Sequence, residues 1–193
     1  MSVVLRKMTR EEFEVFYREG IEQLTQELID EFHFAYQDAN KQAIKEFTDI
    51  LPHGLQTENN FPMAIVEADS GETVGFISVL HKGENDNKMS YIYNLSICEG
   101  KRRNGYASTA LNLAEKKAAE AGCLVSVLFV KDSNNAARAL YRKCGYQDYK
   151  LDKYEQFSLL IKKIRKVIFN YEKNCIFIHN MFYYLWNFYI LYD

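Results

Sequence analysis

Basic residues, an asparagine and a glycine gather where an apolar run gives way to a helical pattern. The stretch is CEGKRRNGYASTA, Cys98 to Ala110. A helix that begins there exposes its first backbone N–H groups, and these donors attract anions together with the positive end of the helix dipole. Gly105 and Ala107 leave the backbone approachable, while Arg102 and Arg103 add positive charge. The pattern predicts a cradle for a phosphate or pyrophosphate.

The stretch is not one of the common nucleotide-binding loops. It lacks the G-x-x-x-x-G-K-[ST] spacing of a P-loop and the G-x-G-x-x-G spacing of a dinucleotide fingerprint. Basic residues in a turn between a strand and a helix can also be merely solvated. The stretch taken alone leaves that alternative open.

A second pattern lies further along the chain, in NNAARALYRKCGY. It resembles the N-x-x-A-x-x-L-Y-x-x-x-G-[FY] helix of the GCN5-related N-acetyltransferases, the GNAT family. Arg102, Gly105 and Ala107 match that family's [RQ]-x-x-G-x-[GA] segment. The matching positions of the second pattern are Asn134, Ala137, Leu140, Tyr141, Gly145 and Tyr146. The two motifs occur in the family's order, and the resemblance covers residues 3–163.

The resemblance implies an N-acetyltransferase that moves an acetyl group from acetyl-CoA to a primary amine by direct attack, without a metal. It also implies that backbone amides of the first motif hold the pyrophosphate of acetyl-CoA. The strand that enters this motif is expected to pair with the pantetheine arm, and a backbone N–H near Ile97 is a candidate oxyanion donor. The cofactor-binding residues expected on this basis are Leu95, Ile97, Arg102, Arg103, Asn104, Gly105, Tyr106, Ala107 and Asn134.

Tyr141 matches the family's helix tyrosine, and the resemblance implies that it donates a proton to the departing thiolate. A phenol is protonated at neutral pH and is able to donate. The alternative is a tyrosine that packs against the cofactor without transferring a proton. Asn134 has a compatible alternative role as a helix N-cap.

The strand from Met89 to Ile97 departs from the family pattern. Many members carry a carboxylate on this strand as general base, whereas here Tyr91, Tyr93 and Asn94 occupy it and no Asp or Glu is present. An asparagine cannot accept a proton as a carboxylate would. Either a water chain or a carboxylate of the N-terminal helices deprotonates the amine, or activity is slow or lost. The last case describes an acyl-CoA-binding module with little or no turnover.

Hydrophobic periodicity and turn signals predict the elements that position these residues. Strands are expected at Val3–Thr9, Pro62–Ala68, Thr73–Leu80, Met89–Ile97, Cys123–Val130, Tyr146–Leu151 and Phe157–Ile164, and helices from Thr9 past Leu28, at Asp38–Leu51, at Gly105–Ala121 and after Asn134. Thr9 with Glu12 forms a capping-box pattern, and Pro52 ends the second helix.

This order of elements indicates one α/β domain. The resemblance implies a GNAT-like mixed central sheet of about six or seven strands flanked by helices. It further implies that the strand entering the cradle and the strand after it splay apart where the cofactor inserts.

Composition limits the classes of partner. The chain has 193 residues and a formal net charge of −2, so no basic surface for nucleic acid is expected. The four cysteines have no zinc-binding spacing and no signal peptide precedes them. We therefore expect reduced thiols in a cytoplasmic protein.

Acidic residues dominate the first two predicted helices. Residues 10–50 contain four Lys or Arg and eleven Asp or Glu. In the GNAT family these helices border the acceptor site, so the resemblance implies a cationic amine on a small molecule or a protein. A solvated helical surface is the alternative.

Residues 164–193 form an aromatic-rich extension beyond an expected acetyltransferase domain at 1–163. The stretch from Cys175 to Tyr192 lacks charged residues and is long enough to span a bilayer, but its asparagines, histidine and tyrosines disfavour a membrane span. We expect this extension to pack on the domain or to face a partner, and a homodimer is one arrangement of that kind.

Overall fold

The computed structural model of the protein describes residues 2–84, 88–149 and 157–165. These form two compact units: a sheet unit made of residues 2–7 and 59–165, and a helical unit made of residues 8–58. The predicted aromatic extension lies, apart from residues 164 and 165, outside the described residues.

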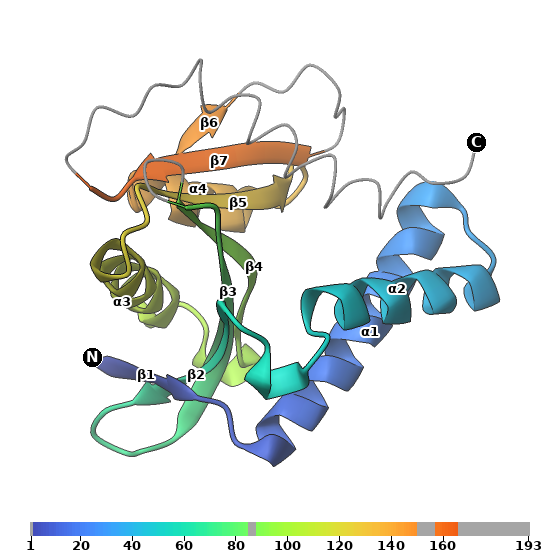
Figure 1. The fold of residues 1–193 in the computed structure, drawn as a ribbon, viewed down its shortest axis with the longest axis horizontal. Helices are drawn as coiled ribbons and strands as arrows, with labels where there is room; N and C mark the ends of the chain where they lie inside the picture. Colours follow the sequence, from blue (N-terminus) through green and yellow to red (C-terminus); the bar gives the residue numbers. More distant parts are fainter. Residues whose placement is uncertain (1, 85–87, 150–156, 166–193) are drawn as a thin grey trace. The chain divides into compact units, whose positions relative to one another are not determined.

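The sheet unit contains seven strands in the order β1-β2-β3-β4-β5-β7-β6 (Figure 1). They are β1 (Val3–Lys7), β2 (Asn60–Glu67), β3 (Thr73–Lys82), β4 (Met89–Ile97), β5 (Val125–Lys131), β6 (Gln147–Tyr149) and β7 (Phe157–Lys163). Among these described strands, β4 and β5 are the parallel pair, and the other neighbours are antiparallel. The prediction of a mixed sheet is confirmed.

Two helices pack on this sheet, α3 (Tyr106–Glu120) and α4 (Asn135–Lys143). The chain reaches α3 from β4 through one turn of 3-10 helix, Glu99–Lys101. Apolar side chains that alternate along the strands meet one face of each helix in a single core, which includes Ile77, Ile92, Leu128, Ala110, Leu111, Ala114 and Tyr141. Burial of each large apolar side chain stabilises the fold by about 2 kcal/mol, so this core fixes α3 and α4 against the sheet.

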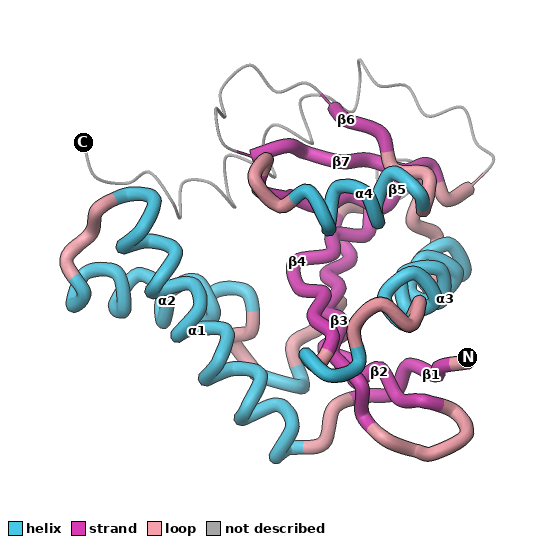
Figure 2. Tube along the Cα trace, turned by 180° about the vertical axis from the view of Figure 1, so that it is seen from behind, coloured by secondary structure: helices cyan, strands magenta, loops and turns pink. Residues whose placement is uncertain are grey.

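The helical unit is a hairpin of α1 (Arg10–Phe32) and α2 (Tyr36–Ile50), which lie side by side (Figure 2). The predicted capping box opens α1: Glu12 N–H donates to Thr9 Oγ1 at 3.2 Å, and Thr9 N–H donates to Glu12 Oε2 at 2.9 Å. His33, in the left-handed conformation with φ 56°, ends α1. A short 3-10 helix, Gly54–Gln56, follows α2.

Small residues let the two helices approach closely. Ala39 and Ala43 of α2 are fully buried in a cluster with Leu28 of α1. A Cβ atom on Gly20 would lie only 2.3 Å from the ring of Phe47, so this ring packs directly on the α1 backbone. α2 begins at Tyr36 rather than at the predicted Asp38, and its N-cap residue makes no side-chain hydrogen bond. Packing between the helices, rather than a local cap, sets this boundary.

Candidate functional site

The stretch between β4 and α3 forms a concave backbone segment. Arg103 and Gly105 both have left-handed φ angles, 64° and 79°. Residues in this conformation within a turn make successive N–H groups converge, which creates a site for an anion. Glycine adopts this conformation without strain at position 105, and the open approach that the sequence predicts is therefore present there.

The first turn of α3 supplies the donors of this cradle, which we define as residues 102–108. Hydrogen bonding within the helix begins with Thr109 N–H, which donates to Gly105 carbonyl oxygen at 3.1 Å. Within the described part of the chain, no group accepts from the N–H groups of Tyr106, Ala107 and Ser108. Gly105 has no side chain to cap them, and the helix dipole adds positive potential. The cradle therefore presents unpaired N–H donors and a positive potential, an arrangement that suits an anion.

The polar side chains of the cradle fold onto its own backbone. Arg102 Nε donates to the carbonyl oxygen of Ile97 at 3.2 Å, and Asn104 Nδ2 donates to that of Lys101 at 3.2 Å. Arg103 is exposed. Arg102 therefore holds the end of β4 against the cradle, while the Arg103 guanidinium faces solvent.

Tyr106 lies in the core, so only its backbone can belong to an anion site. Its side chain is 4% exposed, and its hydroxyl donates to Glu67 Oε1 at the end of β2. This hydrogen bond holds the pKa of Glu67 below its usual value and raises the pKa of Tyr106. The predicted cofactor-binding role of Tyr106 is thus limited to its N–H group.

A brace from the β2–β3 turn holds both ends of the cradle. Glu67 accepts from Tyr106 at the helix end and from Ser70 Oγ at 2.7 Å. Lys101 Nζ, at the strand end, donates to Glu72 Oε2 at 2.6 Å. No sequence signal marked these contacts, because Lys101 lies 29 positions after Glu72 and Tyr106 lies 39 positions after Glu67.

β4 and β5 separate beside the cradle. Their parallel ladder ends at the pair Ile92–Leu128, although β4 continues to Ile97 and β5 to Lys131 (Figure 1). The predicted splay is therefore present. Leu95 and Ile97 pack their side chains toward the core and pair with β3, which leaves the β5-facing backbone edge of β4 for an extended ligand.

A β-bulge at Tyr93 lies next to the point of separation. Ser78 pairs with Asn94, whereas the next residue of β3, Val79, pairs with Ile92, so Tyr93 is the extra residue of β4. The extra residue of a bulge leaves the ladder, and its backbone is free to contact a ligand. The sequence placed the candidate oxyanion donor near Ile97; the bulge adds a second backbone position, and no sequence signal marked it.

Side chains around the bulge are aromatic and amide groups. The Tyr93 hydroxyl donates to Asn60 Oδ1 at 2.8 Å, and burial raises the pKa of Tyr93. The Tyr91 ring lies 6.2 Å from that of Tyr93 and 6.4 Å from that of Phe129 on β5. Asn94 Oδ1 is buried without a hydrogen-bond partner among the described residues.

Tyr141 and Asn134 belong to α4. Asn134 Oδ1 accepts from Ala137 N–H at 3.1 Å, which confirms its role as N-cap. The Tyr141 side chain is 8% exposed and meets the Tyr146 ring edge-on at 5.9 Å. Burial raises the pKa of Tyr141 to about 12, and no described residue hydrogen-bonds to its hydroxyl. This phenol is therefore protonated at neutral pH with its donor capacity unused by the described residues.

Comparison with known proteins agrees with this architecture. The acetyltransferase (GNAT) family model matches residues 21–146. The chain belongs to the GNAT family. The uncharacterized N-acetyltransferase YdgE of Bacillus subtilis is 27% identical over 146 residues, which cover 76% of this chain and 92% of YdgE.

Solved structures show the same GNAT fold. The crystal structure of YycN from Bacillus subtilis has a TM-score of 0.71 and 25% identity, covering 80% of this chain and 98% of YycN. PaiA N-acetyltransferase from Thermoplasma acidophilum, solved with coenzyme A, has a TM-score of 0.60 and 17% identity and covers 84% and 99% of the two chains. The predicted fold and the predicted class, a CoA-dependent N-acetyltransferase, are confirmed at the level of the family.

Among the described residues, no group of three metal-ligating side chains occurs. None of the helices in this part of the chain is long and apolar enough to cross a membrane.

Proposed function

We propose that this GNAT protein transfers the acetyl group of acetyl-CoA to a primary amine by direct attack. The observation that carries the proposal is the row of N–H donors of Tyr106, Ala107 and Ser108, which follows a strand, β4, that runs on to Ile97 after its ladder with β5 has ended at Ile92. This arrangement suits a ligand that has an anionic group at one end and a long polar arm that extends along a strand.

Each part of acetyl-CoA has a proposed contact. The pyrophosphate binds the N–H groups of the cradle, and Arg103 and Asn104 line its outer side. The pantetheine arm lies along the free edge of β4 at Leu95 and Ile97, like an added strand. The thioester then lies near the bulge at Tyr93, where a backbone N–H stabilises the oxyanion.

The proposed reaction is a single transfer. The acceptor ammonium first releases a proton to solvent. The neutral amine nitrogen then forms a bond to the thioester carbon, and the tetrahedral intermediate collapses with cleavage of the C–S bond. Tyr141 donates its proton to the departing sulfur, the new amide nitrogen loses a proton to solvent, and the phenolate regains one. The products are the acetylated amine and CoA thiol.

The high pKa of Tyr141 constrains the timing of this proton transfer. Burial raises the pKa of Tyr141 to about 12. Full transfer to a thiolate with an ordinary thiol pKa near 8.5 would be uphill by on the order of 5 kcal/mol. The phenol therefore donates a hydrogen bond to sulfur and transfers the proton as the amine loses its own.

The proposed acceptor is a cationic amine. The segment that holds α1 and α2 carries four Lys or Arg and eleven Asp or Glu in residues 10–50. Such a surface attracts polyamines, aminoglycosides and exposed lysine side chains. We expect these amines to have lower KM values than neutral amines, with a difference that shrinks as salt is added.

A second candidate function is acyl-CoA binding with little or no turnover. It is favoured by one observation, the absence of any carboxylate from Met89 to Ile97 on β4. The two candidates differ in outcome. The enzyme releases CoA thiol in a panel of amines, whereas the binding module binds acetyl-CoA and releases none.

The cradle is tested by Ala107→Asp, measured by titration calorimetry with acetyl-CoA. An acidic residue in the first turn of a helix favours the helix, but here it would repel the pyrophosphate. We expect affinity to fall by about tenfold or more with an unchanged melting temperature. Asn112→Asp, at an exposed position of the same helix, adds the same charge away from the cradle and should bind normally. Equal affinity in both variants would reject the cradle.

A further inference from the structure

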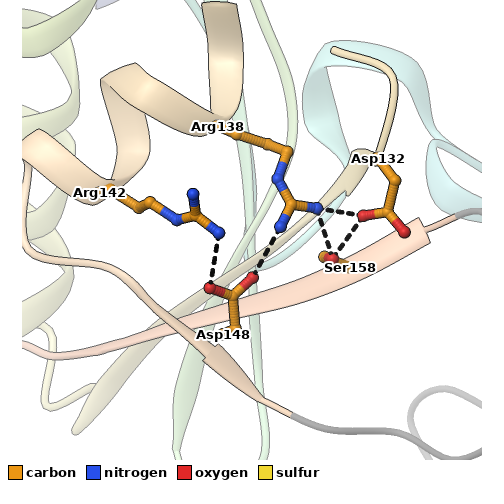
Figure 3. Close-up of polar contacts among 5 residues, drawn as sticks. All are labelled: Asp132, Arg138, Arg142, Asp148 and Ser158. Carbon is orange, nitrogen blue, oxygen red and sulfur yellow. Dashed lines mark hydrogen bonds and ion pairs between the residues drawn. The ribbon is translucent and has the colours of Figure 1, made fainter. Parts of the chain in front are cut away.

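A network of polar and charged side chains joins α4 to neighbouring segments of the sheet unit (Figure 3). Arg138 Nη1 contacts Asp132 and donates to Ser158 Oγ at 2.7 Å, and Arg138 Nη2 donates to Asp148 Oδ1 at 3.2 Å. Ser158 Oγ in turn donates to Asp132 Oδ1 at 2.5 Å. One guanidinium therefore bridges two carboxylates and a hydroxyl.

These partners come from two strands and from the turn that follows a third. Asp132 follows the end of β5, Asp148 belongs to β6 and Ser158 to β7. Arg138 thus joins α4 to each of these segments at once. The planar fork of arginine permits this, because its donors point in fixed, divergent directions.

Arg142 offers a contrast on the same helix. It lies one turn after Arg138 and contacts Asp148 Oδ2 at 3.0 Å. Its side chain is 54% exposed, against 18% for Arg138. Exposed single ion pairs contribute little to a fold, so Arg142 carries a similar charge without the bridging role.

The network joins α4, which carries Tyr141, to β6, which follows the residue whose ring packs on Tyr141. Arg138 lies three residues before Tyr141, a spacing that places both on neighbouring parts of the helix surface. Tyr146, which packs edge-on against Tyr141, lies two residues before Asp148. The Arg138–Asp148 contact therefore joins the helix that carries Tyr141 to the strand that follows its ring partner.

α4 depends on such contacts for its orientation. It has nine residues, fewer than an isolated helix needs to be stable. The Asn134 cap fixes its first turn, and apolar packing fixes its inner face. Apolar packing is weakly directional, whereas a bridged guanidinium restrains rotation and sliding of the helix.

We propose that Arg138 is a positioning residue that aims the Tyr141 hydroxyl at the leaving sulfur. This inference rests on the proposed function of Tyr141 as proton donor. It assigns to Arg138 an effect on the rate that passes through Tyr141 and not through acetyl-CoA binding.

A double-mutant cycle on kcat tests the proposal, with Arg138→Gln, Tyr141→Phe and the double variant. We expect Arg138→Gln to lower kcat by about tenfold with a nearly unchanged KM for acetyl-CoA, because small misplacements of a reacting group are costly. In the Tyr141→Phe background the same change should cost less than about twofold. Arg142→Gln, which removes the same charge one turn away, should leave kcat within about twofold.

A conservative variant separates geometry from charge. Arg138→Lys retains the charge, but one ammonium cannot span Asp132 and Asp148 as the fork does, so kcat should stay reduced. Full activity of Arg138→Lys would overturn the proposal. So would an equal loss of kcat from Arg138→Gln with and without the Tyr141 hydroxyl, which is the result of a purely structural role. If Arg138→Gln fails to fold, the cycle is run with Arg138→Lys.

A spectroscopic readout keeps the inference separate from the proposed function. In protein with 13C-labelled tyrosine rings, the Tyr141 signal is assigned by its loss in Tyr141→Phe. Arg138→Gln should shift or broaden that signal and Arg142→Gln should not. An unmoved signal would overturn the positioning role even in a protein without turnover. If the Tyr141 signal moves in Arg138→Gln but Tyr141→Phe keeps its full kcat, Tyr141 is not the proton donor. The role of Arg138 in directing that hydroxyl to the sulfur is then refuted as well.

Discussion

Tyr141 combines burial with an unused hydroxyl. The side chain is 8% exposed, and its hydroxyl makes no hydrogen bond to any described residue. The raised pKa keeps this phenol protonated at neutral pH. A protonated hydroxyl without a described partner can donate to a bound ligand, which makes Tyr141 a candidate for a role in chemistry.

Replacing Tyr141 by phenylalanine separates chemistry from packing. The ring that packs on Tyr146 is retained, and no hydrogen bond to a described residue is lost, so the melting temperature should change little. We expect kcat for thiol release to fall by about tenfold or more with a nearly constant KM for acetyl-CoA. Tyr36→Phe, which removes an exposed hydroxyl of α2, serves as the control. An unchanged kcat would eliminate Tyr141 as proton donor.

Local signals predicted residues whose partners lie close in sequence. The Thr9–Glu12 capping box and the Asn134 cap each depend on contacts within one turn, and both are as expected. The bulge at Tyr93 could not be predicted, because MSYIYNLSI contains no glycine or proline that would mark it and the shift appears only in its pairing with β3. The Tyr106–Glu67 contact was missed for the same reason, since the partners are distant in sequence.

At the scale of elements, α2 contains a carboxyl group that is almost fully buried. Glu46 is 6% exposed, and its Oε1 accepts from Gln42 Nε2 at 3.1 Å. Burial raises the pKa of Glu46 to about 7, because the ionised form loses its hydration. The folded protein therefore holds this proton at pH values where the unfolded chain has released it.

This carboxyl makes stability depend on pH in a defined direction. Since the pKa is higher in the folded state, the unfolding free energy falls as pH rises from the unfolded pKa near 4.5 to about 7, and is then level. Glu46→Gln removes the effect. The unfolding free energy that Glu46→Gln gains over the original chain should be larger at pH 8.5 than at pH 5.5 by on the order of 2 kcal/mol. Urea denaturation at both pH values measures this, and equal gains would contradict the buried carboxyl. Glu19→Gln, exposed on α1, controls for the loss of charge.

The sequence predicted the first residue of a strand less accurately where contacts with other strands determine it. β2 begins at Asn60 rather than at Pro62, because Asn60 pairs with Leu80 and accepts from Tyr93. β5 begins at Val125, where the parallel ladder to β4 starts at Met89, rather than at the predicted Cys123. The residue pattern of one strand does not show which residues of another strand it pairs with, so these two boundaries could not be predicted.

At the scale of the whole molecule, the strands of the described sheet all precede the aromatic extension. β7 pairs with β5 from Phe157 to Lys163, and the N–H of Ile164 then donates to Leu124 carbonyl oxygen at 3.0 Å. All seven described strands and the cradle therefore precede residue 165. The domain boundary at residue 163 stays a prediction, because residues 166–193 lie outside the described part of the chain.

A chain that ends at Arg165 tests that boundary. We expect it to fold and to bind acetyl-CoA with an affinity within about threefold of the full chain, because the proposed contacts all lie in the retained part. Circular dichroism and calorimetry would measure both properties. Loss of binding in a folded truncated chain would assign residues 166–193 to the site.

The antiparallel pairing of β1 with β2 determines which segment of such a protein can be replaced without disturbing the sheet. Val3 pairs with Glu67 and Lys7 with Met63, so the chain leaves the sheet after β1 and returns beside the same strand. Everything from Met8 to Glu58 is an excursion between two neighbouring strands. Such an excursion can be lengthened, shortened or exchanged at little entropic cost, because loop closure depends only weakly on length. The helical hairpin can therefore be exchanged for another without a change in the order of the strands or in the cradle that follows β4.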